Sequence, residues 1–310
     1  MSVGRLCRLF GVSRQAFYRK EQYEQRARGQ SLLVLDLVLA LRREIPDLGR
    51  RKLHVLLQQP LAESGLKLGR DKLHQLLQAH DLLLRQPRQV PKTTNSAHSL
   101  RKYPNLLVDR PITAPRQVWV SDITYLCIGL GFGYLSLITD AYSKLILGYC
   151  LHPLLTTEGA ALDMALGHGE IGHKLIHHSD RGSQYCSFQY IQKLRQAGIA
   201  ISMTEDGDPY ENAIAERVNG ILKIDFRLNR VFSTFEEAQR AVEASITHYN
   251  HLRPHMSCGY LTPAAAHAST QSLQQLCKPK VSPSRKATIA RKEGSGEIHT
   301  PTLTTSPQDY

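Results

Sequence analysis

Residues 117–152, QVWVSDITYLCIGLGFGYLSLITDAYSKLILGYCLH, decide the fold of this 310-residue chain. The segment is rich in β-branched and aromatic residues and alternates in hydrophobicity, which is typical of β-strands. The glycine-rich stretch 129–133 predicts a hairpin turn, because a second strand rather than a helix follows it. We therefore expect three consecutive antiparallel strands, over 117–128, 134–143 and 144–152.

The chain beyond these strands alternates between helical and strand patterns. The predicted order is helix 156–168, strand 174–180, helix 187–198, strand 199–204, helix 211–228 and a last helix over 234–255. Thr234 and Glu237 form a capping box at the start of the last helix. This element order predicts an α/β fold, an α+β mixed sheet of the ribonuclease H type, over residues 117–268.

Three acidic residues lie at positions from which a metal site could be built. Asp122 is in the middle of the first strand, Asp180 ends the strand 174–180, and Glu216 lies on the helix 211–228. A charged aspartate within an apolar strand is costly unless it is paired or bound to a metal ion. Carboxylates alone as ligands favour Mg²⁺ or Mn²⁺ over zinc. Two such ions can activate a nucleophile and stabilise the leaving oxygen of a phosphodiester.

The helix 211–228 carries polar residues in a row. Glu216, Asn219 and Lys223 follow Asn212 at offsets of 4, 7 and 11, which places them on one helical face. An apolar stripe runs beside this row, so the polar face borders the buried one. Each acid by itself also has a structural interpretation, as a turn residue, a helix cap or a solvated helix position. Their combination, in this order and on these elements, favours a shared site.

Residues 1–30 contain a helix-turn-helix pattern. The first helix is expected to bury Leu6 and Leu9, Gly11 lies in the turn, and Ser13 caps the second helix. Outward side chains of the second helix suit contacts with phosphates and base edges. These candidate DNA-binding residues are Arg14, Gln15, Tyr18 and Arg19. The alternative is an amphipathic hairpin with an ordinary solvated face.

A second helical DNA-binding domain is predicted over 31–85. It comprises an apolar helix over 31–45 and a helical hairpin over 49–85 with leucines at i, i+3 and i+4 spacing. Basic side chains gather at the starts of both hairpin helices, where they oppose the helix dipole. Nearby phosphates would explain that placement. The residues are Arg50, Arg51, Lys52, Arg70 and Lys72.

The charge is distributed unevenly. Residues 1–110 carry 21 Lys and Arg against 9 Asp and Glu, whereas residues 111–268 carry 12 against 15. A basic part that binds polyanions, joined to a part that gathers carboxylates, fits this distribution. The proline-rich segment 86–116 predicts a linker, and the polar segment 269–310 predicts a disordered basic tail.

Membrane and disulfide-rich classes are excluded by composition. No apolar run approaches the roughly 20 residues that span a bilayer, and the arginine-rich N-terminus is unlike a secretory signal. The six cysteines include no Cys-x-x-Cys pair and are expected to be reduced. We expect a cytoplasmic, nucleoid-associated bacterial protein with no membrane partner.

Four motifs resemble the second-frame transposases of the insertion-sequence-three family, which are bacterial relatives of retroviral integrases. They are WVSDITY (119–125), HSDRGSQY (178–185), NAIAERVNGILK (212–223) and YNHLRPH (249–255). The resemblance covers roughly residues 30–268 and implies an integrase core preceded by helix-turn-helix modules. It further implies that Asp122, Asp180 and Glu216 ligate two Mg²⁺ or Mn²⁺ ions, and that Lys223 contacts the terminal DNA of the element.

The function implied by this resemblance is DNA transposition, by 3′ cleavage of the element ends and strand transfer. Implied partners are the terminal inverted repeats, target DNA, further copies of the chain on that DNA, and the upstream-frame product. The family's working enzyme is usually a fusion with that product, which adds a leucine zipper, and no zipper heptads precede residue 30. Two alternatives stay open: a DNA-binding regulator or catalytically inactive remnant, and a nuclease for RNA–DNA hybrids.

Overall fold

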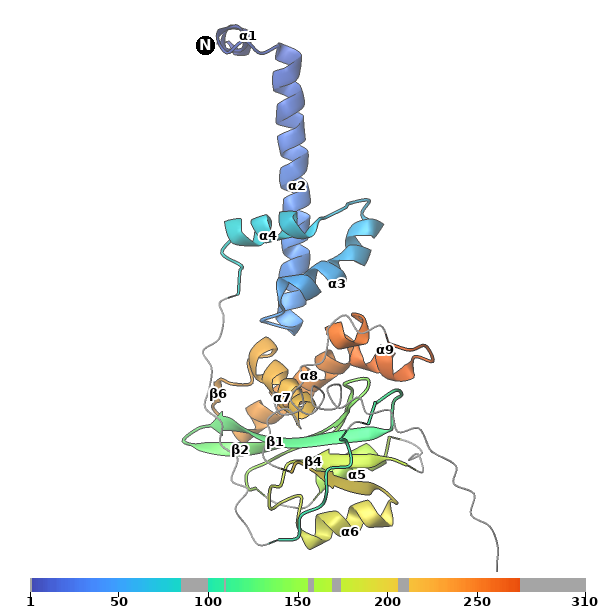
Figure 1. Ribbon diagram of the computed structural model, residues 1–310. Helices are drawn as coiled ribbons and strands as arrows, with labels where there is room; N and C mark the ends of the chain where they lie inside the picture. Colours follow the sequence, from blue (N-terminus) through green and yellow to red (C-terminus); the bar gives the residue numbers. More distant parts are fainter. Residues whose placement is uncertain are drawn as a thin grey trace, which may run out of the picture.

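The computed structural model describes residues 2–84, 100–108, 110–155, 159–168, 174–205 and 212–273. A mixed sheet forms the centre of its larger part (Figure 1). The strands are β1 (Val118–Ile128), β2 (Gly131–Asp140), β3 (Ile146–His152), β4 (Ile176–Ser179), β5 (Ala200–Met203) and β6 (Val231–Phe232). The order across the sheet is β3-β2-β1-β4-β5, and β6 pairs with the end of β1.

The strand directions confirm the predicted ribonuclease H-type sheet. β1, β2 and β3 are antiparallel neighbours, whereas β4 and β5 run parallel to β1. The turn between β1 and β2 is shorter than predicted, because Gly129 adopts a left-handed φ of 56° and lets β2 begin at Gly131. Parallel β4 and β5 each follow a helix, as crossover connections require.

Helices cover both faces of the sheet. One face carries α5 (Ala160–Leu166) and α6 (Phe188–Gln196), and the other carries α7 (Ala213–Asp225), α8 (Phe235–His251) and α9 (Pro263–Ala268) (Figure 1). Strand alternation explains the two layers: Leu137 packs among the residues of α7 and α8, whereas its neighbour Ile138 packs among those of α5 and α6. The predicted cap of α8 is confirmed, since the Glu237 N–H donates to Thr234 Oγ1 at 3.1 Å.

Gly148 allows α5 to lie directly against β3. A Cβ atom at this position would collide with the carbonyl oxygen of Ala161 and approach the backbone nitrogen of Ala165. We expect Gly148→Ala to lower the free energy of unfolding by about 1–3 kcal/mol through overpacking. Gly131→Ala is the matched control, because the nearest atom to its Cβ would be 3.9 Å away. Equal urea midpoints for the two variants would contradict this explanation.

The N-terminal helices differ from the prediction in one respect. The two helices expected around 13–20 and over 31–45 are one continuous 31-residue helix, α2 (Arg14–Glu44), so the predicted domain boundary at residue 30 falls inside it. The intervening residues contain no proline and mostly strong helix formers, and one glycine, Gly29, is tolerated. The first half of α2 projects away from the rest of the protein (Figure 1).

The predicted turn and cap before α2 are confirmed, but the predicted buried residues of α1 (Val3–Leu9) are not. Gly11 has a φ of 64°, and the Ala16 N–H donates to Ser13 Oγ at 3.1 Å. Leu6 and Leu9 are exposed, and α1 buries Gly4 and Cys7 instead. The short helix packs through its glycine because the Arg14 side chain lies against Gly4.

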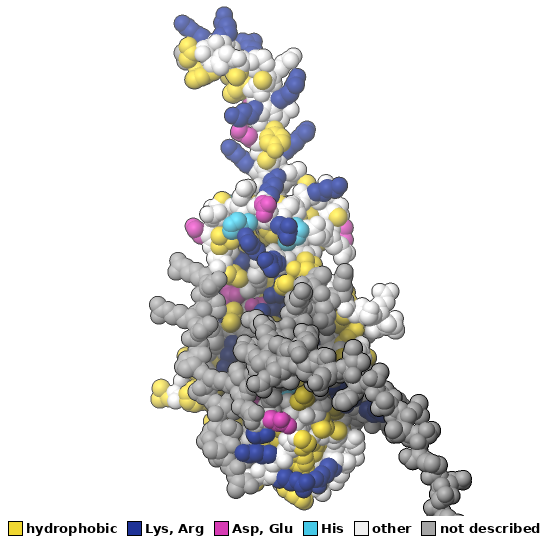
Figure 2. Space-filling view, in the orientation of Figure 1, with side chains coloured by type: hydrophobic (Ala, Val, Ile, Leu, Met, Phe, Trp, Pro, Cys, Tyr) yellow, Lys and Arg dark blue, Asp and Glu magenta, His cyan; other side chains and the backbone are white. Residues whose placement is uncertain are grey.

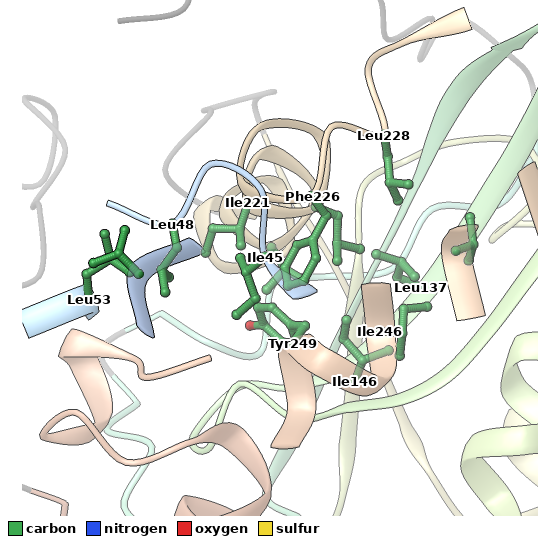
Figure 3. Packing of buried hydrophobic residues seen from close by; sticks show 14 of the residues in the cluster. Ile45, Leu48, Leu53, Leu137, Ile146, Ile221, Phe226, Leu228, Ile246 and Tyr249 are labelled. Carbon is green, nitrogen blue, oxygen red and sulfur yellow. The ribbon is translucent and has the colours of Figure 1, made fainter. Parts of the chain in front are cut away.

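The helices α3 (Arg50–Glu63) and α4 (Arg70–Ala79) confirm the predicted hairpin. With the second half of α2 they form a helical unit whose core includes Val38, Leu53, Leu57, Leu73 and Leu77. This core continues without interruption into that of the sheet domain. Ile45 and Leu48, after α2, lie beside Ile221, Phe226 and Tyr249 of the sheet domain (Figure 3).

The described part of the predicted linker packs on the sheet domain. Pro104 accepts a hydrogen bond from the Met203 N–H at 3.3 Å, and the Leu106 N–H donates to Ser202 Oγ at 2.9 Å. Residues 86–99 lie outside the described part. The predicted tail begins similarly, since the Leu273 N–H donates to Tyr142 Oη at 3.0 Å, and residues 274–310 lie outside the described part.

Candidate active site

Two adjacent parallel strands bring Asp122 and Asp180 to the same level of the sheet. Residues 118–121 of β1 pair in register with residues 176–179 of β4. The next residue after the last pair is the aspartate on both sides, so Asp122 and Asp180 directly follow paired residues of adjacent strands. β4 ends there while β1 continues to Ile128, which leaves the two side chains at the open end of the shorter strand.

The helix α7 is attached to β1 beside these acids. Asn219 Nδ2 donates to Asp122 Oδ2 at 2.8 Å, and Asn212 Nδ2 donates to the carbonyl oxygen of Ser121 at 3.1 Å. Glu216 lies between the two asparagines on the same helical face. The polar row predicted from the sequence therefore faces β1.

Two of the predicted acids act electrostatically on the third, Asp122. Burial raises the pKa of Asp122 to about 7, the charge of Asp180 adds to the rise, and Glu216 makes a smaller contribution in the same direction. Hydrogen bonds from Asn219 and from the Ile123 N–H, at 2.9 Å to Oδ1, oppose the shift. The ionised form of Asp122 is therefore destabilised at neutral pH in the absence of a neutralising cation.

The donor set fits a hard divalent cation. All three candidate ligands are carboxylates, and the buried Oδ1 atoms of Asn212 and Asn219 have no hydrogen-bond partner among the described residues. The three acids lie near one another, but their carboxylate groups do not surround a single point. Within the described ranges, no three His, Cys, Asp or Glu side chains already lie close enough together to hold one ion.

Lys223 lies one turn beyond Asn219 on the same helix. Its ammonium is 4.5 Å from the centre of the Tyr125 ring, in a cation–π contact. Burial lowers the pKa of Lys223, and the charge of Asp122 opposes that shift. The predicted DNA-contacting lysine thus borders the acidic cluster.

The other candidate DNA-binding residues lie mostly on the surface of the helices. The exposed residues are Arg14, Gln15, Tyr18, Arg19, Arg50, Arg51, Arg70 and Lys72. Lys52 requires a correction. Its side chain is only 17% exposed, and its Nζ lies 3.5 Å from Asp225 Oδ2 at the end of α7. The residue faces the sheet domain because its helix packs there.

A buried histidine lies beside the acids, in the pair His177 and His178, for which the sequence predicts a partly buried strand end with one imidazole tuning the site. His177, on β4, shares hydrogen bonds through Nε2 with Ser121 Oγ at 2.7 Å and Tyr190 Oη at 3.0 Å. Burial, followed by the charge of His178, lowers its pKa to about 3, so the imidazole is neutral. The sequence signal was a polar residue close to each acid within an apolar strand. Ser121 directly precedes Asp122, and His177 lies three residues before Asp180. This network fixes β1 to β4 next to Asp122.

The sequence is similar to transposases over most of its length. Two models of the integrase core domain match residues 112–209 and 197–263. The chain is 40% identical over 266 residues to the insertion element IS600 uncharacterized 31 kDa protein of Shigella sonnei, covering 84% of this chain and 96% of that protein. It is 29% identical over 270 residues to transposase InsF for insertion sequence IS3A of Escherichia coli K12, covering 84% and 92%.

Viral integrases are among the solved structures to which the chain is similar. One is the cryoEM structure of a simian T-cell lymphotropic virus intasome in complex with PP2A regulatory subunit B56 gamma, with 19% identity, a TM-score of 0.44, and coverage of 76% of this chain and 80% of that chain. Another is the HTLV-2 integrase catalytic core domain in complex with magnesium, with 17% identity, a TM-score of 0.39, and coverage of 50% and 97%. By its sequence relatives, its integrase core and its sheet topology, the chain belongs to the insertion-sequence-three family of transposases, within the retroviral integrase superfamily.

Proposed function

We propose that this transposase cleaves the 3′ ends of its own element and joins them to target DNA, with Asp122, Asp180 and Glu216 as ligands of two Mg²⁺ or Mn²⁺ ions. The observation that carries the proposal is that the two aspartates directly follow the paired residues of β1 and β4, with Asp122 held by Asn219 of α7. Asp180 and Glu216, from distant parts of the chain, both act electrostatically on Asp122, which supports the proposal.

Two residues of α7, Asn219 and Lys223, have supporting roles in this reaction. Asn219 holds Asp122 Oδ2 by its hydrogen bond, which fixes the orientation of the carboxylate. Asp122, Asp180 and Glu216 would hold the divalent ions, whose chemistry would be activation of a water or 3′-hydroxyl and stabilisation of the leaving oxygen of the phosphodiester. Lys223 supplies a positive charge at the border of the site, where it suits a phosphate of the terminal DNA.

The DNA would be bound by the N-terminal helices. Figure 2 shows Lys and Arg side chains distributed along α1 and the projecting part of α2. Because such residues neutralise phosphates, the affinity for DNA is expected to fall as the salt concentration rises.

We further propose that the chain works as a homo-oligomer on DNA in the bacterial nucleoid, and that the upstream-frame product is a partner. Among the described residues, no helix has the length and apolar character to cross a membrane.

The function is tested by incubating the purified chain with labelled DNA from the ends of its element. We expect 3′ nicking and joining with Mg²⁺, and neither with EDTA. Glu216→Gln should reduce both at least about a hundredfold, since metal-assisted charge stabilisation contributes several kcal/mol. Specific binding of the end DNA without metal-dependent nicking by the unaltered protein would contradict the proposal and favour a DNA-binding regulator.

A further inference from the structure

The C-terminal end of α7 is held by residues from two distant parts of the chain. Asp225, the last residue of α7, is largely buried, and its Oδ2 accepts hydrogen bonds from Arg253 Nε at 2.8 Å and Lys52 Nζ at 3.5 Å. Arg253 Nη2 also lies 2.8 Å from the same oxygen. The carbonyl oxygen of Asp225 accepts from the Asp47 N–H at 2.9 Å. Both Lys52 and Asp47 belong to the N-terminal helical unit.

Lys52 occupies a position that is unsuitable for a phosphate contact. Its side chain extends from α3 to Asp225 of the sheet domain. Burial, followed by the charge of Arg253, lowers the pKa of Lys52 to about 8, although Asp225 opposes the shift. A lysine that bound DNA would be exposed to solvent, as Arg50 and Arg51 are on the same turn. The location at the negative end of the α7 dipole favours the cation there.

Apolar packing makes this contact part of a firm interface. Ile45 and Leu48 lie beside Ile221 of α7 and Phe226, the residue that follows Asp225 in the chain (Figure 3). At the rim, Arg227 binds both carboxylate oxygens of Asp47, at 3.0 and 2.7 Å. The helical unit is therefore docked on the C-terminal end of α7 and is not an independent module.

The same helix carries Glu216 near its other end. Asp225 lies nine positions after Glu216, which corresponds to about 14 Å along the helix axis. Asn212 and Asn219 attach the first part of α7 to β1, and Asp225 is the attachment at the far end. A rigid helix held at both ends has a fixed tilt, so loosening one end changes the position of the glutamate.

We propose that Lys52 is a positioning residue: by its ion pair with Asp225 it lets the N-terminal helical unit set the tilt of α7 and thereby the position of Glu216 relative to Asp122 and Asp180. This inference rests on the proposed function. It also divides the first turn of α3 between two tasks. Arg50 and Arg51 face outward toward DNA, and Lys52 connects the same turn to the helix of the active site.

The test compares Lys52→Met with Lys52→Arg and with Lys67→Met, an exposed control in the loop before α4. The rate constant for Mg²⁺-dependent nicking and the affinity for end DNA are measured over a series of salt concentrations. We expect Lys52→Met to lower the nicking rate by about tenfold to a hundredfold, as small misplacements of catalytic groups do. Its affinity and salt slope should stay those of the unaltered protein. Lys52→Arg should restore most of the rate, and Lys67→Met should lose none.

A second measurement does not depend on activity. Amide hydrogen exchange in residues 219–225 should be faster in Lys52→Met than in the unaltered protein, and Asp225→Asn should add little in the double variant. A weaker affinity with a salt slope reduced by about 1 would make Lys52 a phosphate contact and overturn the inference. So would unchanged nicking and unchanged exchange. If the unaltered protein does not nick DNA at all, the proposed function fails, whereas the exchange result still decides whether Lys52 holds α7.

Discussion

Asp122→Asn is expected to abolish metal-dependent nicking and, at neutral pH, to stabilise the metal-free protein. The loss of activity follows from removal of a proposed metal ligand. The gain in stability follows from the environment of the carboxylate, whose pKa is raised to about 7 first by burial and then by Asp180. An asparagine keeps an oxygen that can accept the hydrogen bond from Asn219 and removes the charge that the site repels.

The sign of the pH dependence follows from the two pKa values of Asp122. In the unfolded chain the value is about 3.9, and in the folded protein it is about 7. Its contribution to stability is therefore fully present below pH 4 and is lost as the pH rises to 7. The stabilisation by Asn should appear over the same interval and reach about 1–2 kcal/mol at pH 7.5, allowing for partial solvent screening.

Urea unfolding in EDTA at several pH values measures this gain. Asp36→Asn, an exposed change on α2, serves as the control and should change the free energy of unfolding by less than about 0.5 kcal/mol. Mg²⁺ should stabilise the unaltered protein more at pH 8 than at pH 6, because the ligands must be deprotonated. Mg²⁺ should have little effect on the Asn variant. A variant that is less stable than the unaltered protein at pH 7.5 would contradict the electrostatic account.

The sheet could be predicted because its information is local. The alternation within 117–152 specifies three strands that pair with their sequence neighbours, and the structure confirms them. The proximity of Asp122 and Asp180 required more, since 57 residues separate them and only the parallel register of β1 and β4 makes them neighbours. Their places within or at the end of an apolar strand were the sequence signal, because a charge is costly there without a partner.

The parts that could not be predicted depend on packing between distant segments. Residues 21–30 lack a clear apolar period, so the two predicted helices looked separate, although no residue there ends a helix. The orientation of Lys52 depends on the docking of α3 against α7, which has no counterpart in local sequence. The local sequence around a basic residue at a helix start is the same whether the side chain faces DNA or an aspartate of another domain.

Arg253→Met is expected to destabilise the whole protein by about 3–5 kcal/mol, the usual cost of leaving a buried charge without its partner. Arg253 is only 1% exposed, and it holds Asp225 Oδ2 through both Nε and Nη2 at 2.8 Å. Lys52 remains in the variant, but at 3.5 Å it makes the weaker contact. Arg240→Met, an exposed change on α8, is the control and should alter the free energy of unfolding by less than about 0.5 kcal/mol.

A double variant separates the charge from the packing. If the uncompensated carboxylate of Asp225 causes the loss, Arg253→Met combined with Asp225→Asn should be more stable than Arg253→Met alone. Urea unfolding monitored by circular dichroism gives both values, and a double variant that is less stable by the sum of the two single losses would exclude the ion pair as the cause. The contrast with Lys52 is then informative. Arg253 is required for the fold around α7, so its loss should lower the unfolding midpoint, whereas the loss of Lys52 should change the nicking rate while the midpoint stays close to that of the unaltered protein.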